Sequence, residues 1–269
     1  MSNIIVLLFL FMLGASFGSF LSVVIYRLHA KKKGIVFGHS ICPECKFELE
    51  FVDMIPVFSY ALLRGKCRKC KKTIPGQYLL LELSCGLLFV AIYFLYPFLT
   101  FAGDSVTFAG EMFVPFLFNS IYSVFLIGIL FYDLRTSTIP DVFLFPLLGA
   151  AALGTLATGA DLLDHVIIAP LIALAFFGGQ IFFSKGKWLG EGDLYLSLSL
   201  AVIFGWKLFI VCVVASYILG AVISLVLLLS KKIGRKSQIP FGPFLVIGAF
   251  TTLFFGTEIL SWYLGSLAI

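Results

Sequence analysis

Two aspartates are placed where their carboxyl groups could act together on a peptide bond. Asp133 follows an uncharged apolar run, and Asp193 closes a Gly-x-Gly-Asp motif that precedes another apolar run. Two carboxyl groups that share one proton can hydrolyse an amide, because one takes a proton from water while the other donates one to the carbonyl oxygen. Gly190 and Gly192 would let an extended peptide approach the backbone closely. Together these residues indicate an aspartic protease site.

Each aspartate also has a plainer interpretation when it is taken alone. Asp is a favoured helix N-cap, and Asp193 stands directly before an apolar helix. Either carboxylate could instead pair with a nearby base, namely Arg135, Lys185 or Lys187. The catalytic interpretation therefore depends on both aspartates reaching the same membrane face, where ionisable groups are costly and usually mark function.

Four of the six cysteines form two Cys-x-x-Cys pairs, and 21 residues separate the pairs. The four are Cys42, Cys45, Cys67 and Cys70. This spacing is typical of a structural zinc site, because four thiolates complete a tetrahedron and leave no open position for catalysis. Disulfides or free thiols are the alternatives, and a reducing compartment disfavours disulfides. A loop of about 50 residues buries little core, so zinc binding would supply its folding free energy.

The composition indicates that a lipid bilayer surrounds most of the chain. Of 269 residues, 61% are hydrophobic and only 12% are charged, and the mean hydropathy is +1.09. Soluble domains carry roughly 25% charged residues. The chain therefore lacks the polar surface of a water-soluble globule, and a disordered chain, a disulfide scaffold and a soluble enzyme are excluded.

Eight charge-poor windows are candidates for membrane helices. They cover residues 4–26, 73–103, 112–132, 142–160, 166–184, 194–206, 208–230 and 237–257. Crossing the hydrocarbon core takes about 20 helical residues. The window at 194–206 is shorter than this, so its helix is expected to begin at or before Asp193, to tilt, or to be partly re-entrant. The fold class predicted is an all-α polytopic membrane protein with about eight spans.

The distribution of basic residues sets the orientation. With eight spans and both termini outside, every Lys and Arg except Lys207 falls on the inner side, as the positive-inside rule requires. Both aspartates then lie at the inner boundary. The expected domains are a first span at 1–26, a cytoplasmic cysteine domain at 27–77 and a membrane core of seven spans at 78–269. The basic residues adjoin membrane segments and lack an aromatic stacking platform, so nucleic acid is not an expected partner.

Several motifs in order resemble one known family, the bacterial type IV prepilin peptidases, which are membrane aspartic proteases of the GxGD class. The motifs are GSFLSVVIYR at 18–27, CPEC at 42–45, IPVFSY at 55–60, LRGKC at 63–67, LEL at 81–83, IPD at 139–141 and GEGD at 190–193. The resemblance extends over nearly the whole chain. It departs from the family pattern at Ser22, where Asn is usual.

The resemblance implies an activity, a location and partners. Such enzymes sit in the bacterial cytoplasmic (inner) membrane and cut pilin-like precursors of pilus or protein secretion systems between a basic leader and an apolar helix. Many also methylate the new N-terminus with S-adenosylmethionine. By resemblance, Asp133 and Asp193 are the catalytic pair, and the four cysteines belong to the cytoplasmic domain associated with methyl transfer. Glu82, an acid within an apolar window, is a candidate for substrate or methyl-transfer contact, with a helix–helix hydrogen bond as the alternative.

A different class of function also fits a polytopic chain with buried acids. In that alternative the protein is a transporter or a metal-handling membrane protein, its carboxylates line an ion path, and the zinc ribbon is regulatory. Transporter sites usually lie near the bilayer midplane, whereas these carboxylates gather at one membrane face. The peptidase interpretation is therefore preferred.

Overall fold

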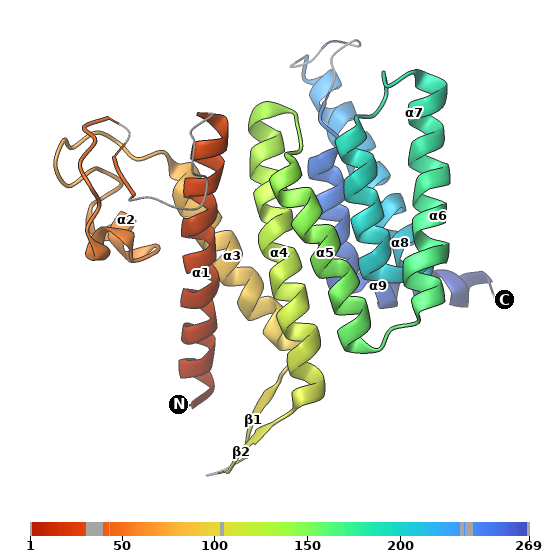
Figure 1. Cartoon of the computed structure of the whole chain (residues 1–269), viewed down its shortest axis with the longest axis horizontal. Coiled ribbons are helices and arrows are strands. Elements are labelled where there is room, and N and C mark those ends of the chain that lie inside the picture. The colour runs from red at the N-terminus through yellow and green to blue at the C-terminus, as the bar shows by residue number, and fades with distance from the viewer. Residues whose placement is uncertain are drawn as a thin grey trace. The chain divides into compact units, whose positions relative to one another are not determined.

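The computed structural model describes residues 2–30, 40–42, 44–102, 105–231, 234 and 239–267 (Figure 1). The chain divides into two compact units, Met1–Gly128 and Ile129–Ile269. Seven helices in the described residues are long and apolar enough to cross a bilayer, so the protein is a multi-pass membrane protein. The cysteine segment lies between the first and second of them, as predicted.

The first unit holds two packed membrane helices and the cysteine segment between them. Its elements are α1 (Ser2–His29), η1 (Phe51–Met54), α2 (Phe58–Leu62), α3 (Gly76–Leu95), β1 (Leu99–Ala102), β2 (Ser105–Phe108) and the first part of α4 (Gly110–Thr136). The antiparallel pair β1–β2 is a small exception to the all-helical prediction.

Glycines bring α1 and α3 into close contact. A Cβ atom at Gly14 would come within 2.5 Å of the Cys85 carbonyl oxygen, and one at Gly18 within 2.5 Å of the Leu81 carbonyl oxygen. Small residues four apart let membrane helices approach this closely without a large apolar driving force. The contact places the backbone of Glu82 directly opposite Gly18.

The second unit is a helical bundle. It contains the end of α4, then α5 (Asp141–Thr158), η2 (Leu163–Ile168), α6 (Ala169–Ala173), η3 (Leu174–Gly178), α7 (Gly179–Ser184), α8 (Glu191–Leu229) and α9 (Gly242–Leu267). The run from η2 to α7 is one apolar span interrupted by two π-helical stretches. Its inward side chain Phe177 is fully buried, as are Leu196 of α8 and Leu245 of α9.

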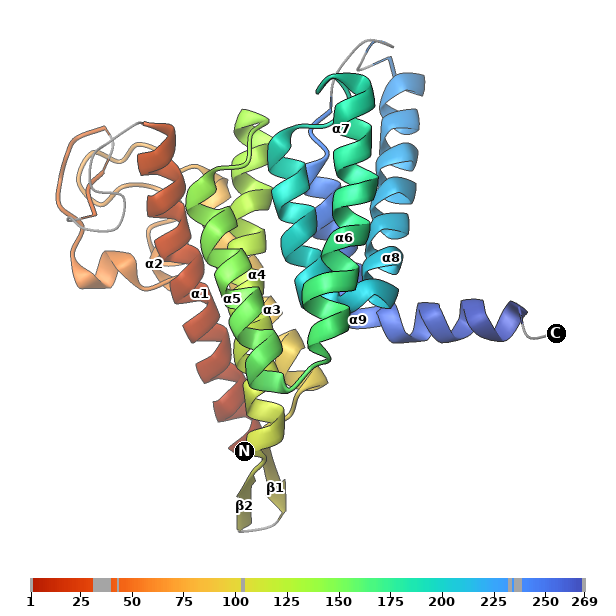
Figure 2. The ribbon, with the colours of Figure 1, turned by 45° about the vertical axis from the view of Figure 1, so that its right-hand side comes forward.

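The predicted number of eight spans differs from the seven continuous helices because α8 contains two predicted windows. Gly205 within α8 has φ 67° and ψ 171°, which is not helical. The two segments of α8 on either side run in opposite directions (Figures 1 and 2). The first segment begins at Glu191, which agrees with the prediction that the short helix starts at or before Asp193.

The reversal at Gly205 is held by residues of η2. The Trp206 N–H donates to Asp164 Oδ1 at 2.8 Å, and His165 Nδ1 lies 2.9 Å from the Val202 carbonyl oxygen. These groups satisfy backbone atoms that the break in the helix leaves without helical partners. The clamp therefore fixes where the helix that carries Asp193 turns back.

Candidate active site and metal centre

The four predicted cysteines converge on one point. Their Sγ atoms all lie within 4.8 Å of one another, and Cys42 Sγ is 3.9 Å from Cys70 Sγ. Tetrahedral zinc with Zn–S bonds of about 2.3 Å places its sulfur ligands roughly 3.8 Å apart. The donor set and its spacing therefore fit zinc.

The same two backbone hydrogen bonds form a turn at each Cys-x-x-Cys pair. In the first, the Cys42 N–H donates to the Phe47 carbonyl and the Lys46 N–H to the Cys42 carbonyl, both at 2.9 Å. In the second, the Cys67 N–H donates to the Lys72 carbonyl at 2.9 Å and the Lys71 N–H to the Cys67 carbonyl at 3.1 Å. Lys46 and Lys71 both have positive φ, 56° and 60°. This repeated turn orients both thiols of a pair toward one side, as a zinc ribbon requires.

The cysteine thiols differ in acidity. The backbone N–H of Cys70 lowers the pKa of Cys67 to about 7. At Cys70 the backbone N–H of Lys72 favours the thiolate, but desolvation and the neighbouring cysteines outweigh it and raise the pKa to about 11. One thiolate forms readily and the next is disfavoured beside it. A divalent cation would remove that repulsion, which is why such clusters bind metal.

Ion pairs join the two cysteine pairs across the cluster. Lys72 contacts the Glu44 carboxylate. Arg68 Nε donates to Asp53 Oδ1 at 2.8 Å, and Lys69 Nζ lies 5.2 Å from the centre of the Phe47 ring. The exposed Lys72–Glu44 pair contributes little free energy. The role of these contacts is to set the register of one cysteine pair against the other.

Glu82 connects the membrane helices to the cysteine segment. Its side chain is buried, at 7% exposure, and its Oε2 accepts the Val57 N–H at 2.7 Å. Val57 has φ 64°, so its amide points out of the local chain and needs an acceptor from elsewhere. The Glu82 side chain also hydrogen-bonds Ser19 of α1, so the predicted helix–helix bond is present beside a bond to the loop. Contact between Glu82 and substrate or methyl donor stays a prediction.

Asp133 lies in the last turn of α4 and is 2% exposed. Its carbonyl accepts the Ser137 N–H at 2.8 Å, which ends the helix, and Ser137 has φ 53°. The chain then passes through Ile139 to Pro140, whose fixed φ precedes the start of α5. This tight turn holds the carboxyl group at the end of the bundle.

Asp193 lies in the first turn of α8. Its Oδ2 accepts the Gly190 N–H at 3.2 Å, so the side chain does act as part of a helix cap. The neighbouring Gly192 packs against Ile139, which belongs to the turn that follows Asp133. Capping fixes the orientation of Asp193 and is compatible with a catalytic role, because it uses one carboxylate oxygen.

Two residues absent from the predicted site lie beside these aspartates. A Cβ atom at Gly242, the first residue of α9, would overlap Asp133 Oδ2, and it would lie 3.1 Å from Ile139 Cδ1. A Cβ at Gly192 would also lie 3.1 Å from Ile139, at its Cβ. Ile139 therefore packs between the Gly-x-Gly-Asp motif and the start of α9. The sequence signal that could have indicated Gly242 is its position between two prolines, in PFGP at 240–243.

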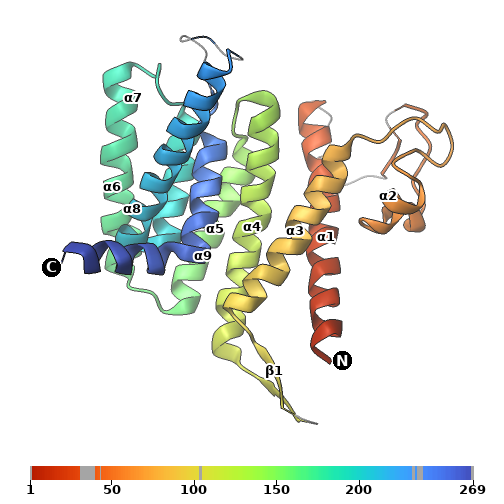
Figure 3. The same ribbon diagram turned by 180° about the vertical axis from the view of Figure 1, so that it is seen from behind.

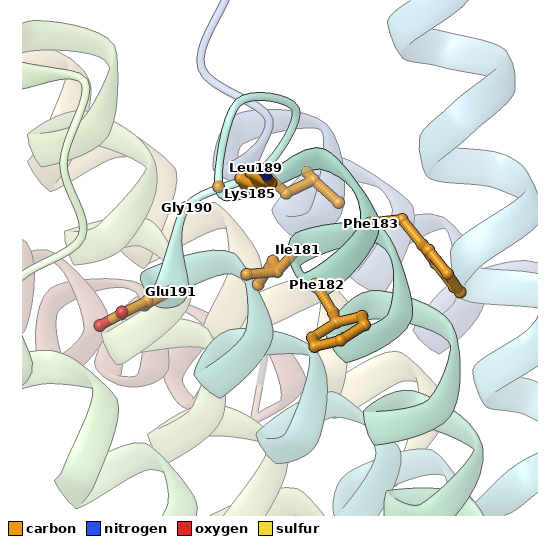
Figure 4. Close-up of a pocket in the computed structure, with 8 residues that line it drawn as sticks. Ile181, Phe182, Phe183, Lys185, Leu189, Gly190 and Glu191 are labelled. Carbon is orange, nitrogen blue, oxygen red and sulfur yellow. The ribbon is translucent and has the colours of Figure 1, made fainter.

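A cavity opens beside the loop that leads to Asp193 (Figure 4). Its volume is about 800 Å³ and it shares Gly190 and Glu191 with that loop. Phe182 and Phe183 project from the end of α7, and Glu191 points away from them. The predicted motif residue Gly190 thus adjoins both the cavity and the Asp193 carboxylate.

Two family models match separate stretches of the chain. Residues 12–96 match the bacterial peptidase A24 N-terminal domain, and this stretch contains the four cysteines and Glu82. Residues 120–225 match the type IV leader peptidase family, and this stretch contains Asp133 and Asp193. No solved structure matches the chain.

Several curated proteins are similar over almost their full length. The chain is 30% identical to a prepilin leader peptidase/N-methyltransferase of Stutzerimonas stutzeri, over 94% of this chain and 91% of the relative. Proteins of the same name from Aeromonas hydrophila and Pseudomonas aeruginosa are 28% and 27% identical, over 96% and 94% of this chain and 93% and 91% of the relatives. With two aspartates and a four-cysteine cluster in matching regions, this chain belongs to the type IV leader peptidase family.

Proposed function

We propose that the chain is a membrane aspartic endopeptidase that removes the leader from prepilin-like precursors and then methylates the new N-terminus. The relatives carry both activities in their name, and they align over more than nine-tenths of this chain. The transporter alternative is not favoured, because no matched family or curated relative named here is a transporter.

One observation carries the assignment of the catalytic pair. Asp133 at the end of α4 and Asp193 at the start of α8 are far apart in the sequence, yet Ile139 in the turn after Asp133 packs against Gly192, the residue before Asp193. If the two aspartates served only as helix caps, there would be no reason for acids from two different helices to meet at one site. A pair that shares a proton does require this arrangement.

The pair supports hydrolysis by moving protons between water, the substrate and the two carboxyl groups. The ionised aspartate takes a proton from water, and the resulting hydroxide adds to the scissile carbonyl, whose oxygen accepts the proton of the other aspartic acid. When the tetrahedral intermediate collapses, the C–N bond breaks, the amine leaves with a proton from the first aspartate, and a hydroxyl of the intermediate returns a proton to the second aspartate as the C=O bond re-forms. Gly192 and Gly242 carry no side chain, which lets their backbones pack directly against Ile139 and Asp133.

Methyl transfer is a separate reaction on the product. The neutral N-terminal amine attacks the sulfonium methyl group of S-adenosylmethionine, so that a C–N bond forms as a C–S bond breaks and the amine loses a proton. The cysteine domain with structural zinc is the part of the chain to which we assign this activity. Its four ligands would be Cys42, Cys45, Cys67 and Cys70.

The orientation follows from charge. We place the cysteine domain and both aspartates on the cytoplasmic side of a bacterial inner membrane, with both termini outside, because this puts nearly all basic residues inside. The substrates are then pilin-like precursors whose leader lies at the cytoplasmic face, and the enzyme meets membrane lipid on its outer surface.

Mass spectrometry of a prepilin-like precursor incubated with the purified protein tests both activities. Loss of the leader is expected without methyl donor, and a further mass gain of one methyl group with S-adenosylmethionine. Asp133→Asn and Asp193→Asn should each lower cleavage by about 10²- to 10⁴-fold. Asp141→Asn is the matched control, because Asp141 is an exposed acid at the start of the neighbouring helix α5. An intact precursor with folded wild-type protein would overturn the proposal.

A further inference from the structure

A short stretch of the cysteine segment exposes an unusual amount of apolar surface. Between residues 51 and 62, five large apolar side chains are exposed: Phe51 (79%), Val52 (49%), Met54 (40%), Phe58 (57%) and Leu62 (78%). Phe58 and Leu62 stand four apart on α2 and so share one face of it. Contiguous apolar patches on water-exposed domains usually mark an interaction surface.

The 51–62 segment does not lie beyond the end of α1. The views from the front, from a 45° turn and from behind all show α2 alongside α1, set back from the end of α1 that leads into the cysteine segment (Figures 1, 2 and 3). Since α1 is an apolar helix long enough to cross the bilayer, a neighbour set back from its end lies close to the lipid surface. The exposed face of α2 is therefore within reach of lipid.

The backbone of this segment is suited to an apolar environment. Lipid offers no hydrogen bonds, so amides there need partners within the protein. The N–H groups of Ser59, Ala61 and Leu63 donate to carbonyls within α2 and its approach, at 3.0 Å each. The Val57 N–H, which the bend turns outward, donates to Glu82.

The charged groups next to the segment are also arranged for a membrane surface. The side chain of Asp53, the one acid within residues 51–62, is 2% exposed and paired with Arg68. Arg64, Lys66 and Lys69 follow α2 and are exposed. Basic residues beside inserted apolar side chains attract anionic lipid headgroups.

We propose that the 51–62 segment inserts its apolar side chains into the lipid leaflet on the side of the membrane that carries the cysteine domain. The occupant of this surface is phospholipid, with anionic headgroups at the basic residues. Spans α1 and α3 hold the segment at both ends, so the leaflet is always within reach. The cysteine domain is then a membrane-embedded attachment rather than a freely tumbling loop.

Fluorescence quenching in the full-length protein tests the proposal. The native Trp188, Trp206 and Trp262 are replaced by Phe, and Phe51→Trp or Phe58→Trp then supplies one probe. The protein is reconstituted into phosphatidylcholine–phosphatidylglycerol vesicles with or without brominated acyl chains. Glu48→Trp is the matched control, because Glu48 is exposed beside the first cysteine pair.

The expected result for the Phe51→Trp and Phe58→Trp variants is strong quenching by brominated acyl chains and weak quenching by aqueous iodide. The Glu48→Trp variant should show the reverse. Quenching of the indole at position 51 or 58 by iodide alone would overturn the proposal. Quenching by neither agent would also overturn it, because the surface would then be covered by protein, such as a second copy or the substrate.

A second measurement needs no substitution. A lipid-soluble diazirine in vesicles that contain the wild-type protein should label peptides from residues 51–62 on illumination, and a water-soluble diazirine should not. The peptide that contains Glu44 and Glu48 serves as the internal control and should show the opposite preference. Labelling of the 51–62 segment from water alone would contradict insertion.

Discussion

Gly242 lies so close to Asp133 that a methyl group on its Cα would overlap the Oδ2 atom of the carboxylate. The start of α9 therefore forms one wall of the site, although Gly242 follows Asp133 by 109 residues in the sequence. The absence of a side chain at Gly242 determines the position that the carboxyl group can occupy.

Gly242→Ala should lower kcat/KM for precursor cleavage by about 10²-fold, because a displacement of about 1 Å at a reacting group costs that much. The decrease should appear in kcat. The pH dependence of cleavage should also shift, because the added methyl group displaces water from the Asp133 carboxyl group. A folding defect alone would lower active enzyme without shifting that profile. Gly265→Ala, at a position with open space, is the control and should retain wild-type activity. Unchanged kinetics in Gly242→Ala would refute this role.

Zinc content should depend on the thiols and on pH. Cys67→Ser should reduce bound zinc well below one equivalent, whereas Cys85→Ser, in the membrane helix α3, should leave it unchanged when measured by elemental analysis. The pKa of Cys67 is lowered to about 7. A thiolate with a lowered pKa is present above that value and lost as the pH falls through it, so a chelator should extract zinc faster at about pH 6 than at about pH 8. Equal extraction rates would contradict this.

Substitutions at Glu82 separate a structural role from a chemical one. Glu82→Leu removes the acceptor of the Val57 N–H and should destabilise the cysteine segment by about 1–3 kcal/mol, seen as faster hydrogen exchange of residues 55–60. Glu82→Gln keeps an acceptor oxygen and should restore protection. If Glu82→Gln retains protection but loses methyl transfer, the charge itself takes part in the reaction.

Gly205→Ala should destabilise the bundle. With φ 67° and ψ 171°, Gly205 occupies a region that is essentially restricted to glycine, and a side chain there costs about 1–3 kcal/mol. A Cβ there would also come within 2.9 Å of Asp164 and His165. Thermal unfolding in detergent should show a lower midpoint for Gly205→Ala. Gly149→Ala, in an open position on α5, should show an equal or higher midpoint. Identical midpoints for both variants would argue against strain at Gly205.

The sequence predicted features that depend on local pattern. Apolar windows predicted the membrane helices, and the spacing of Cys42, Cys45, Cys67 and Cys70 predicted a cluster that the structure confirms. The charge count predicted that residues 194–206 and 208–230 are separate spans, and the structure reverses direction between them at Gly205.

The features that the sequence did not predict arise from contacts between distant segments. The approach of Gly242 to Asp133, and the bond from Val57 to Glu82, join residues 109 and 25 positions apart. No periodicity in a single helix records such a contact. The exposure of the apolar side chains in residues 51–62 was also not predictable, because the sequence of a loop in a hydrophobic chain does not indicate which side chains face outward.

The first segment of α8 has a consequence for the bilayer itself. Residues 191–204 form a helix about 21 Å long, at about 1.5 Å per residue, whereas the hydrocarbon core is about 30 Å thick. Local thinning of the membrane at Asp193 is one way to accommodate this hydrophobic mismatch. Thinning of this kind would bring headgroups and bulk water to the level of the aspartates. The shape of the lipid surface would then give water, the second reactant in hydrolysis, access to the site.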